Sequence, residues 1–166
     1  MERALPAFNQ AGPEGGRIFL AGSPIYFPNF KLPHLLEEAG LAVTADDLCS
    51  SERLFPTNVA VDEPSETGLL RSLAENYHQG CLCPTFGDNE RRANNILGAV
   101  SGSGLKGVVF HVLKGCHPYD LESLALEGPL KAAGTRFLKV ETDYAAEDSR
   151  NLQTRLEAFR QTLRQQ

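Results

Sequence analysis

Four short apolar segments, separated by stretches of helical periodicity, constrain the fold of this chain more than any other feature. Segment 108–113 is almost entirely apolar, as expected for a strand that is buried on both faces. The other three segments are 17–21, 41–45 and 135–141. Because strands that alternate with helices are joined by right-handed crossovers, we expect an α/β domain with a four-stranded parallel sheet and helices on both faces.

The predicted strand order is 2-1-3-4, which is a doubly wound arrangement. In that order the winding reverses between the first and third strands, and a crevice opens at the carboxyl edge of the sheet. Ligands of open α/β sheets bind in such crevices. The loops 22–29 and 114–119 are expected to line it.

Apolar residues spaced three and four positions apart predict the helices between the strands. Ser65 or Thr67 is expected to cap the second helix, and Asp88 the third. A fourth helix is expected from about Asp120, and Pro129 is expected to interrupt or bend it because proline removes a helical hydrogen bond. The other helical patterns span residues 32–39, 69–74, 93–100 and 152–163.

Length and charge limit the class of protein. The chain has 166 residues, which suits one domain with its own hydrophobic core. A net charge of −5 without a Lys/Arg cluster argues against a nucleic-acid partner. No apolar stretch approaches the roughly 20 residues that span a bilayer. We expect a flexible arm over residues 1–16, a domain over 17–166, and a soluble cytoplasmic location without a membrane partner.

The four cysteines are the main candidates for chemistry. Cys49 and Cys116 each follow a predicted strand, so both are expected at the carboxyl edge of the sheet. Cys81 and Cys83 alternate along the chain and point opposite ways if extended, so one of them is expected to be a ligand. We choose Cys83, which precedes proline. Soft thiolates that converge on one edge favour a metal ion or an iron–sulfur cluster over disulfides in a reducing compartment.

There are two alternatives to a cluster for these thiols. Cys49 follows Asp46-Asp47, whose charges disfavour a thiolate, so a small buried hydrophobe is the local alternative there. A closed tetrahedral zinc site is the second alternative. Its four ligands would be Cys49, Cys83, Cys116 and His117.

Several motifs follow one another along the chain in an order that resembles a known family. They are Gly22-Ser-Pro-Ile25, Asp46-Asp-Leu-Cys49, Cys83-Pro84, Lys114-Gly-Cys116 and Glu141-Thr-Asp-Tyr144. As a set they resemble the 2-hydroxyacyl-CoA dehydratase family, which includes benzoyl-CoA reductase subunits and double-cubane cluster proteins. The resemblance runs from Arg17 onward and covers the family's carboxyl-terminal domain, for which it implies a flavodoxin-like fold.

The resemblance implies an oxygen-sensitive iron–sulfur protein with a 4Fe–4S or double-cubane cluster. Carried over by motif, its ligands are Cys49, Cys83 and Cys116. In the family an ATP-dependent activator, itself an iron–sulfur protein, injects one low-potential electron that reaches a thioester carbonyl. The resulting ketyl radical permits elimination of water or reduction of an aromatic ring, whereas the double-cubane relatives reduce small molecules.

The implied substrate is therefore an acyl-CoA or a small molecule. We expect Gly22, Ser23, Pro24 and Asn29 to bind it in the crevice, with backbone N–H groups near Ser23 and Cys116 donating to cluster sulfur or to the thioester oxygen. No catalytic acid or base is assigned.

The family's amino-terminal domain contributes cluster cysteines and much of the substrate cavity, so a partner subunit that supplies this domain is expected. The alternative is a non-catalytic flavodoxin-like domain that docks onto a separate partner subunit. Such a domain should expose an apolar patch of roughly several hundred Å².

Overall fold

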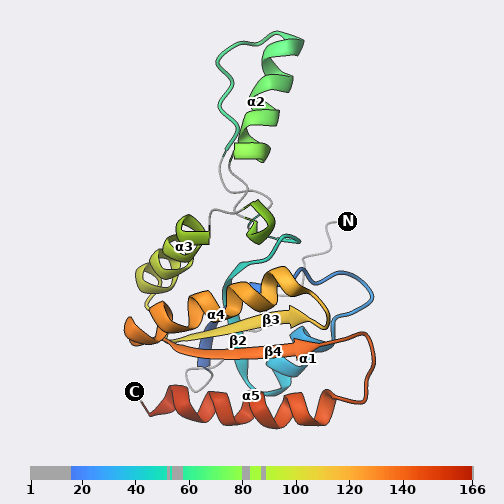
Figure 1. The fold of residues 1–166 in the computed structure, drawn as a ribbon, viewed down its shortest axis with the longest axis vertical. Helices are drawn as coiled ribbons and strands as arrows, with labels where there is room; N and C mark the ends of the chain where they lie inside the picture. The colour runs from blue at the N-terminus through green and yellow to red at the C-terminus, as the bar shows by residue number, and fades with distance from the viewer. Residues whose placement is uncertain (1–15, 52, 54–57, 80–82, 87–88, 166) are drawn as a thin grey trace, which may run out of the picture.

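The computed structural model describes residues 16–51, 53, 58–79, 83–86 and 89–165. Cys81 and the predicted cap Asp88 lie outside the described residues, as does the predicted amino-terminal arm apart from Gly16, which is the first residue of a strand. Within the described part of the chain, four strands form one sheet with helices on both faces (Figure 1).

The sheet is parallel throughout. Strand β1 (Gly16–Gly22) lies between β2 (Leu41–Asp47) and β3 (Gly107–Leu113), and β4 (Arg136–Thr142) pairs with the other side of β3. The order β2-β1-β3-β4 confirms the predicted doubly wound, flavodoxin-like α/β fold. Strand β3 is buried over its first six residues because it has a neighbour on each side and helices on both faces.

Alternate residues of the strands face two separate hydrophobic cores. Leu20 and Val109 belong to the core beneath α1 and α5, whereas Phe19 and Phe110 belong to the core beneath α3 and α4. These helices are α1 (Lys31–Glu38), α3 (Asn89–Gly102), α4 (His117–Ala132) and α5 (Ser149–Arg164). The sheet is thus the middle of three layers, and its carboxyl edge carries the loops of interest.

Two details of helix α4 differ from the sequence-based expectation. The helix begins at His117, three residues earlier than predicted, with Cys116 as the N-cap residue and Pro118 in the first turn. The predicted interruption at Pro129 is wrong, because α4 continues to Ala132. Pro129 lies on the exposed side of the last turn, where water can hydrate the carbonyl group that loses its N–H partner.

Helix α2 (Glu66–Gln79) projects away from the three layers (Figure 1). The Ser65 side-chain oxygen accepts a hydrogen bond from the Gly68 N–H at 3.0 Å, which confirms Ser65 as the cap. The short helix η2 (Pro84–Phe86) contacts both α3 and α4. None of the helices among the described residues is both long and apolar enough to cross a membrane.

Candidate functional site

The loop after β1 is fastened to β3 at the carboxyl edge of the sheet. Gly22 has φ +110°, and a Cβ atom there would lie 2.0 Å from the His111 carbonyl oxygen, so only glycine fits. The Ser23 N–H donates to that same oxygen at 2.8 Å, and the Ser23 hydroxyl accepts from the Leu113 N–H at 3.0 Å. Gly22 and Ser23 therefore fix the start of this loop against β3.

His111 joins three strands at this edge and is only 1% exposed. Its Nδ1 lies 3.0 Å from the Ser23 carbonyl oxygen, and its Nε2 lies 2.7 Å from the Thr142 hydroxyl at the end of β4. Burial lowers the pKa of His111, so the neutral ring is the favoured form. Sequence reasoning did not single out this residue, although a lone polar residue within an otherwise apolar strand was a usable signal.

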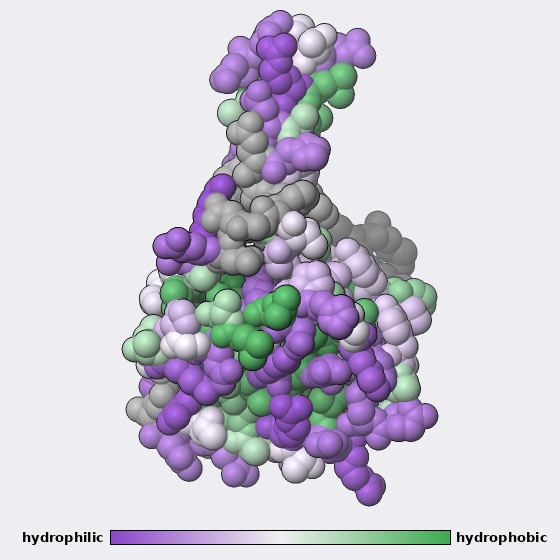
Figure 2. Space-filling model, viewed as in Figure 1, coloured by the Kyte–Doolittle hydropathy of each residue, from purple (hydrophilic) through white to green (hydrophobic). Residues whose placement is uncertain are grey.

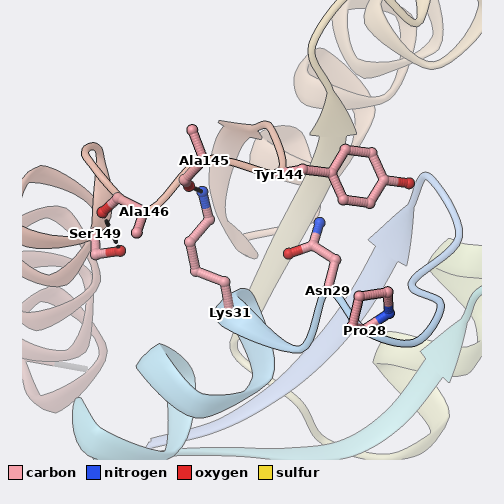
Figure 3. A pocket seen from close by; sticks show the side chains of 7 residues that line it. All are labelled: Pro28, Asn29, Lys31, Tyr144, Ala145, Ala146 and Ser149. Atoms are coloured by element: carbon pink, nitrogen blue, oxygen red, sulfur yellow. Dashed lines mark hydrogen bonds between the residues drawn. The ribbon is translucent and has the colours of Figure 1, made fainter.

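A cavity of 290 Å³ opens between the loops that follow β1 and β4 (Figure 3). The Lys31 ammonium group crosses it to the Ala145 carbonyl oxygen at 2.6 Å and to Asp148 Oδ1 at 2.5 Å, so the two loops are tied together. In Figure 3 the Asn29 amide and the Tyr144 ring lie beside each other at the other end of the cavity. The lining residues are Pro28, Asn29, Lys31, Tyr144, Ala145, Ala146 and Ser149.

The four residues predicted to bind substrate thus occupy different places. Asn29 lines the cavity. Gly22 and Ser23 are buried and hold the strands together, and Pro24 is half-buried between them and the cavity. The loop also carries exposed aromatic side chains, of which Phe27 is 82% exposed.

The three described cysteines are free thiols and half-buried, and their segments approach helix α4. Cys49 Sγ lies 3.2 Å from the hydroxyl of Tyr119 on α4. Cys116 is the N-cap residue of that helix. Cys83 directly precedes η2, which contacts α4, and its Sγ lies 3.0 Å from Thr85 Oγ1.

These thiols do not form a closed metal site within the described residues. No group of three or more His, Cys, Asp or Glu side chains in this part of the chain is arranged to hold a metal ion. The structural zinc site of Cys49, Cys83, Cys116 and His117 is therefore contradicted, because a closed zinc site needs all four ligands around one point.

The prediction for the backbone donors is also wrong for two N–H groups. The Ser23 N–H donates to His111, and the Cys116 N–H donates to the Leu113 carbonyl oxygen at 2.8 Å. Both donors are used within the fold because the loops turn sharply after β1 and β3.

A buried network of charged side chains lies next to Cys49. Arg92 of α3 is 1% exposed and forms ion pairs with Asp47 at the end of β2 and with Glu122 of α4. Arg53 is 7% exposed, and its Nη1 lies 3.8 Å from Asp47 Oδ2. Two cations thus compensate two carboxylates that would be costly to bury alone.

Burial determines the direction of the carboxyl pKa shifts in this network. It raises the pKa of Asp47 to about 6 against the opposing effects of Arg92 and Arg53. It also raises the pKa of Glu122, again against Arg92. Sequence reasoning missed the network, because its members are far apart along the chain.

The network reaches the thiol of Cys49 through Arg53 and Tyr119. Arg53 Nη2 donates to Cys49 Sγ and, at 2.5 Å, to the Tyr119 hydroxyl. The guanidinium groups of Arg53 and Arg92 lie 5.7 and 5.9 Å from the centre of the Tyr119 ring. Burial raises the pKa of Tyr119, which keeps its hydroxyl group protonated.

Comparison with known proteins identifies the family to which this chain belongs. The family model for the 2-hydroxyglutaryl-CoA dehydratase D-component matches residues 1–163. The chain belongs to this D-component family. The sequence-based resemblance to 2-hydroxyacyl-CoA dehydratases is thereby confirmed.

Three curated proteins are similar to this chain over most of its length. "Putative dehydratase subunit YjiM" of Escherichia coli K12 is 32% identical over 86% of this chain and 36% of its own length. The (R)-phenyllactyl-CoA dehydratase beta subunit of Clostridium sporogenes is 23% identical over 90% of this chain and 38% of its own length. The (R)-2-hydroxyglutaryl-CoA dehydratase beta subunit of Acidaminococcus fermentans is 26% identical over 90% and 39%, respectively. The chain therefore spans less than two fifths of the length of these relatives.

The thiols of this family member fit an iron–sulfur cluster by their chemistry but not as a complete set. They are soft ligands without disulfide partners and are partly accessible, and Cys116 is the N-cap residue of α4. No three of the described His, Cys, Asp or Glu side chains are grouped to hold a metal ion, so the described residues alone do not form a cluster site.

Proposed function

We propose that this chain contributes the flavodoxin-like domain of an iron–sulfur-dependent 2-hydroxyacyl-CoA dehydratase, or of a related benzoyl-CoA reductase type of enzyme. The observation that carries the proposal is that the segments with three free thiols meet α4 in a chain that belongs to the D-component family. The names of two relatives specify 2-hydroxyacyl thioesters that lose water, which supports the dehydratase over the reductase.

In this proposal Cys49, Cys83 and Cys116 donate to a 4Fe–4S or double-cubane cluster, and Cys116 is the main ligand. When bound, the cluster would accept the low-potential electron and pass it on for the radical elimination of water. The remaining ligands come from a partner subunit with the amino-terminal domain, which is consistent with relatives that are named as subunits. An ATP-dependent activator iron–sulfur protein is the proposed source of the electron.

The proposed substrate site is the cavity between the loops that follow β1 and β4. Gly22, Ser23 and Pro24 begin the loop that leads to this cavity, and Asn29 and Tyr144 line it. A volume of 290 Å³ is at the lower end of the range for small-molecule sites, so the cavity suits the acyl part of a thioester rather than a whole coenzyme A. Aromatic side chains on the loop add apolar surface for the acyl chain.

The test is turnover by the assembled enzyme. The protein is produced without oxygen together with its partner subunit and assayed with the activator, ATP and a panel of 2-hydroxyacyl-CoA thioesters. Cys116→Ala is expected to abolish turnover, whereas Asn29→Ala is expected to raise KM more than it lowers kcat. Undiminished turnover by Cys116→Ala would overturn the proposal.

A non-catalytic docking role is the second candidate, and one observation favours it. Leu69, Leu70, Leu73 and Tyr77 form an apolar stripe on α2 in which each side chain is 40–60% exposed. Figure 2 shows hydrophobic side chains along one side of the projecting segment. Such a stripe is typical of a surface that another protein covers. A partner complex that forms with the wild type but not with Leu70→Glu, in a preparation without turnover or iron, would support this role over the enzymatic one.

A further inference from the structure

Lys31 places a positive charge in the cavity between the loops that follow β1 and β4 (Figure 3). Among the described residues that line this cavity, Lys31 is the charged one, and the others are neutral. Its side chain is 12% exposed. An ammonium group at such a place attracts an anionic part of a ligand when its charge is not already compensated, so the partners of Lys31 decide what the cavity accepts.

The charge of Lys31 is compensated within the protein. Its Nζ donates to Asp148 Oδ1 at 2.5 Å and to the Ala145 carbonyl oxygen at 2.6 Å, and it lies 3.8 Å from Asp143 Oδ1. Asp148 is the N-cap residue of α5, and within that fully described helix its side chain makes no cap hydrogen bond, so the carboxylate is directed at Lys31. A ligand carboxylate would therefore have to displace Asp148 and would lie beside two carboxylates.

The rest of the cavity favours an apolar group. Pro28, Ala145 and Ala146 line it. The segment that supplies Pro28 also carries Phe27 and Phe30, which are 82% and 42% exposed and whose ring centres lie 6.1 Å apart. An apolar lining with few polar groups is typical of sites that bury a hydrocarbon chain.

We propose that the cavity accepts an uncharged, apolar acyl group and rejects an acyl group that bears a free carboxylate. Asp148 is the specificity-determining residue, because it holds Lys31 in an internal ion pair and keeps the ammonium group from binding another anion. This selectivity rests on the proposed function, in which the acyl part of the thioester lies in this cavity. An apolar chain leaves the Lys31 contacts intact, whereas a carboxylate loses its hydration without gaining an unpaired cation.

The test compares two pantetheine thioesters that differ in the charge at the end of the acyl chain. One is 2-hydroxyglutaryl-pantetheine, and the other is its neutral isostere, in which an isopropyl group replaces the terminal carboxylate. Isothermal titration calorimetry with the full chain measures the Kd of each and requires neither a cluster nor turnover. The wild type is expected to bind the neutral thioester at least about tenfold more tightly, because a charged group that is desolvated without a partner is strongly disfavoured.

Asp148→Asn should reduce this preference about tenfold, since it releases Lys31 for a charge-assisted hydrogen bond with the carboxylate of the probe. Asparagine is also a favoured N-cap residue, so the start of α5 is retained. Asp62→Asn, which removes an exposed carboxylate in the segment before α2, is the matched control and should leave the preference unchanged. Adding Lys31→Met to Asp148→Asn should abolish the gain in carboxylate binding.

The possible failures are distinguishable. Equal or tighter binding of the carboxylate thioester by the wild type would overturn the selectivity and leave the proposed function standing. An unchanged preference in Asp148→Asn, or a gain that persists without Lys31, would overturn the role of Asp148. If neither thioester binds the wild type, the cavity is not the acyl site, and that part of the proposed function is overturned together with the selectivity. The expected preference in a protein whose complex lacks turnover would overturn the proposed enzyme but support the selectivity.

Discussion

Replacement of Arg92 by methionine tests whether the buried charge network stabilises the folded protein. Arg92 is 1% exposed and bridges Asp47 on β2 and Glu122 on α4. Among the described residues, its loss leaves these two buried carboxylates with Arg53 as the remaining neighbouring cation. Breaking a buried ion pair by removing one partner typically costs about 3–5 kcal/mol. In a domain of this length each kcal/mol lowers Tm by about 2–4 °C, so the expected loss is roughly 6–20 °C.

The pH dependence of this loss gives a sharper test. Arg92 lowers the pKa of both carboxyl groups against the effect of burial, so Arg92→Met should raise both pKa values further. A group whose pKa is raised on folding stabilises the protein at low pH, and that contribution is lost as the pH rises through the folded-state pKa. The destabilisation should therefore be smaller at pH 5 than at pH 8.

The assay is urea unfolding followed by circular dichroism at both pH values. Arg91→Met is the matched control, because Arg91 is the exposed neighbour of Arg92 on the same helix, and surface changes usually stay within about 0.5 kcal/mol. Adding Glu122→Gln to Arg92→Met should recover part of the loss, since it removes one of the stranded charges. Equal unfolding free energies for Arg92→Met and Arg91→Met would refute the reasoning.

Three further predictions concern the carboxyl edge and helix α2. Gly22→Ala should destabilise the protein by at least about 1–3 kcal/mol, because Gly22 has a positive φ and an added Cβ would collide with the His111 carbonyl oxygen. The control Gly98→Ala, in open space on α3, should be neutral or stabilising. Equal urea midpoints for the two variants would contradict this prediction. Because burial lowers the pKa of His111, its own contribution to stability should be constant above pH 6.5 and should decrease as the pH falls below it. His111→Gln should flatten that acid slope in thermal melts, and an unaltered slope would count against the assignment. Leu70→Glu should leave Tm within about 2 °C of the wild type, since the side chain is 60% exposed; a large loss would mean that the stripe is packed within the chain.

The arrangement of the sheet could be predicted because each strand is recognisable from its own apolar segment in the sequence. Strand β3 is apolar at nearly every position, and this pattern occurs only where both faces are covered. The order β2-β1-β3-β4 then follows when right-handed crossovers must place helices on both faces of the sheet. The start of α4 was misplaced because Gly115-Cys116-His117-Pro118 resembles a loop, although proline suits a first helical turn.

The buried network could not be predicted, because it depends on contacts between residues far apart along the chain. Arg92 and Glu122 are 30 positions apart and each occurs among other charged residues. A signal was nevertheless present. Arg92 is in helical register with Ile96 and Val100, and Glu122 with Leu126 and Leu130, so both charges occupy core-facing positions of their helices. The sequence allowed the cysteines to be ranked as candidate ligands. The residues that contact their thiols could not be predicted, since Cys49 and Tyr119 are 70 positions apart.

The most direct measurement of the central claim is the iron and acid-labile sulfide content of the anaerobically purified complex, compared between the wild type and Cys116→Ala. The proposed function predicts iron and sulfide in equal amounts in the wild type, with a broad absorption band near ~400 nm, and loss of both in the variant. The same iron and sulfide content in both proteins would contradict Cys116 as the main ligand, and a wild type without iron would contradict the cluster itself.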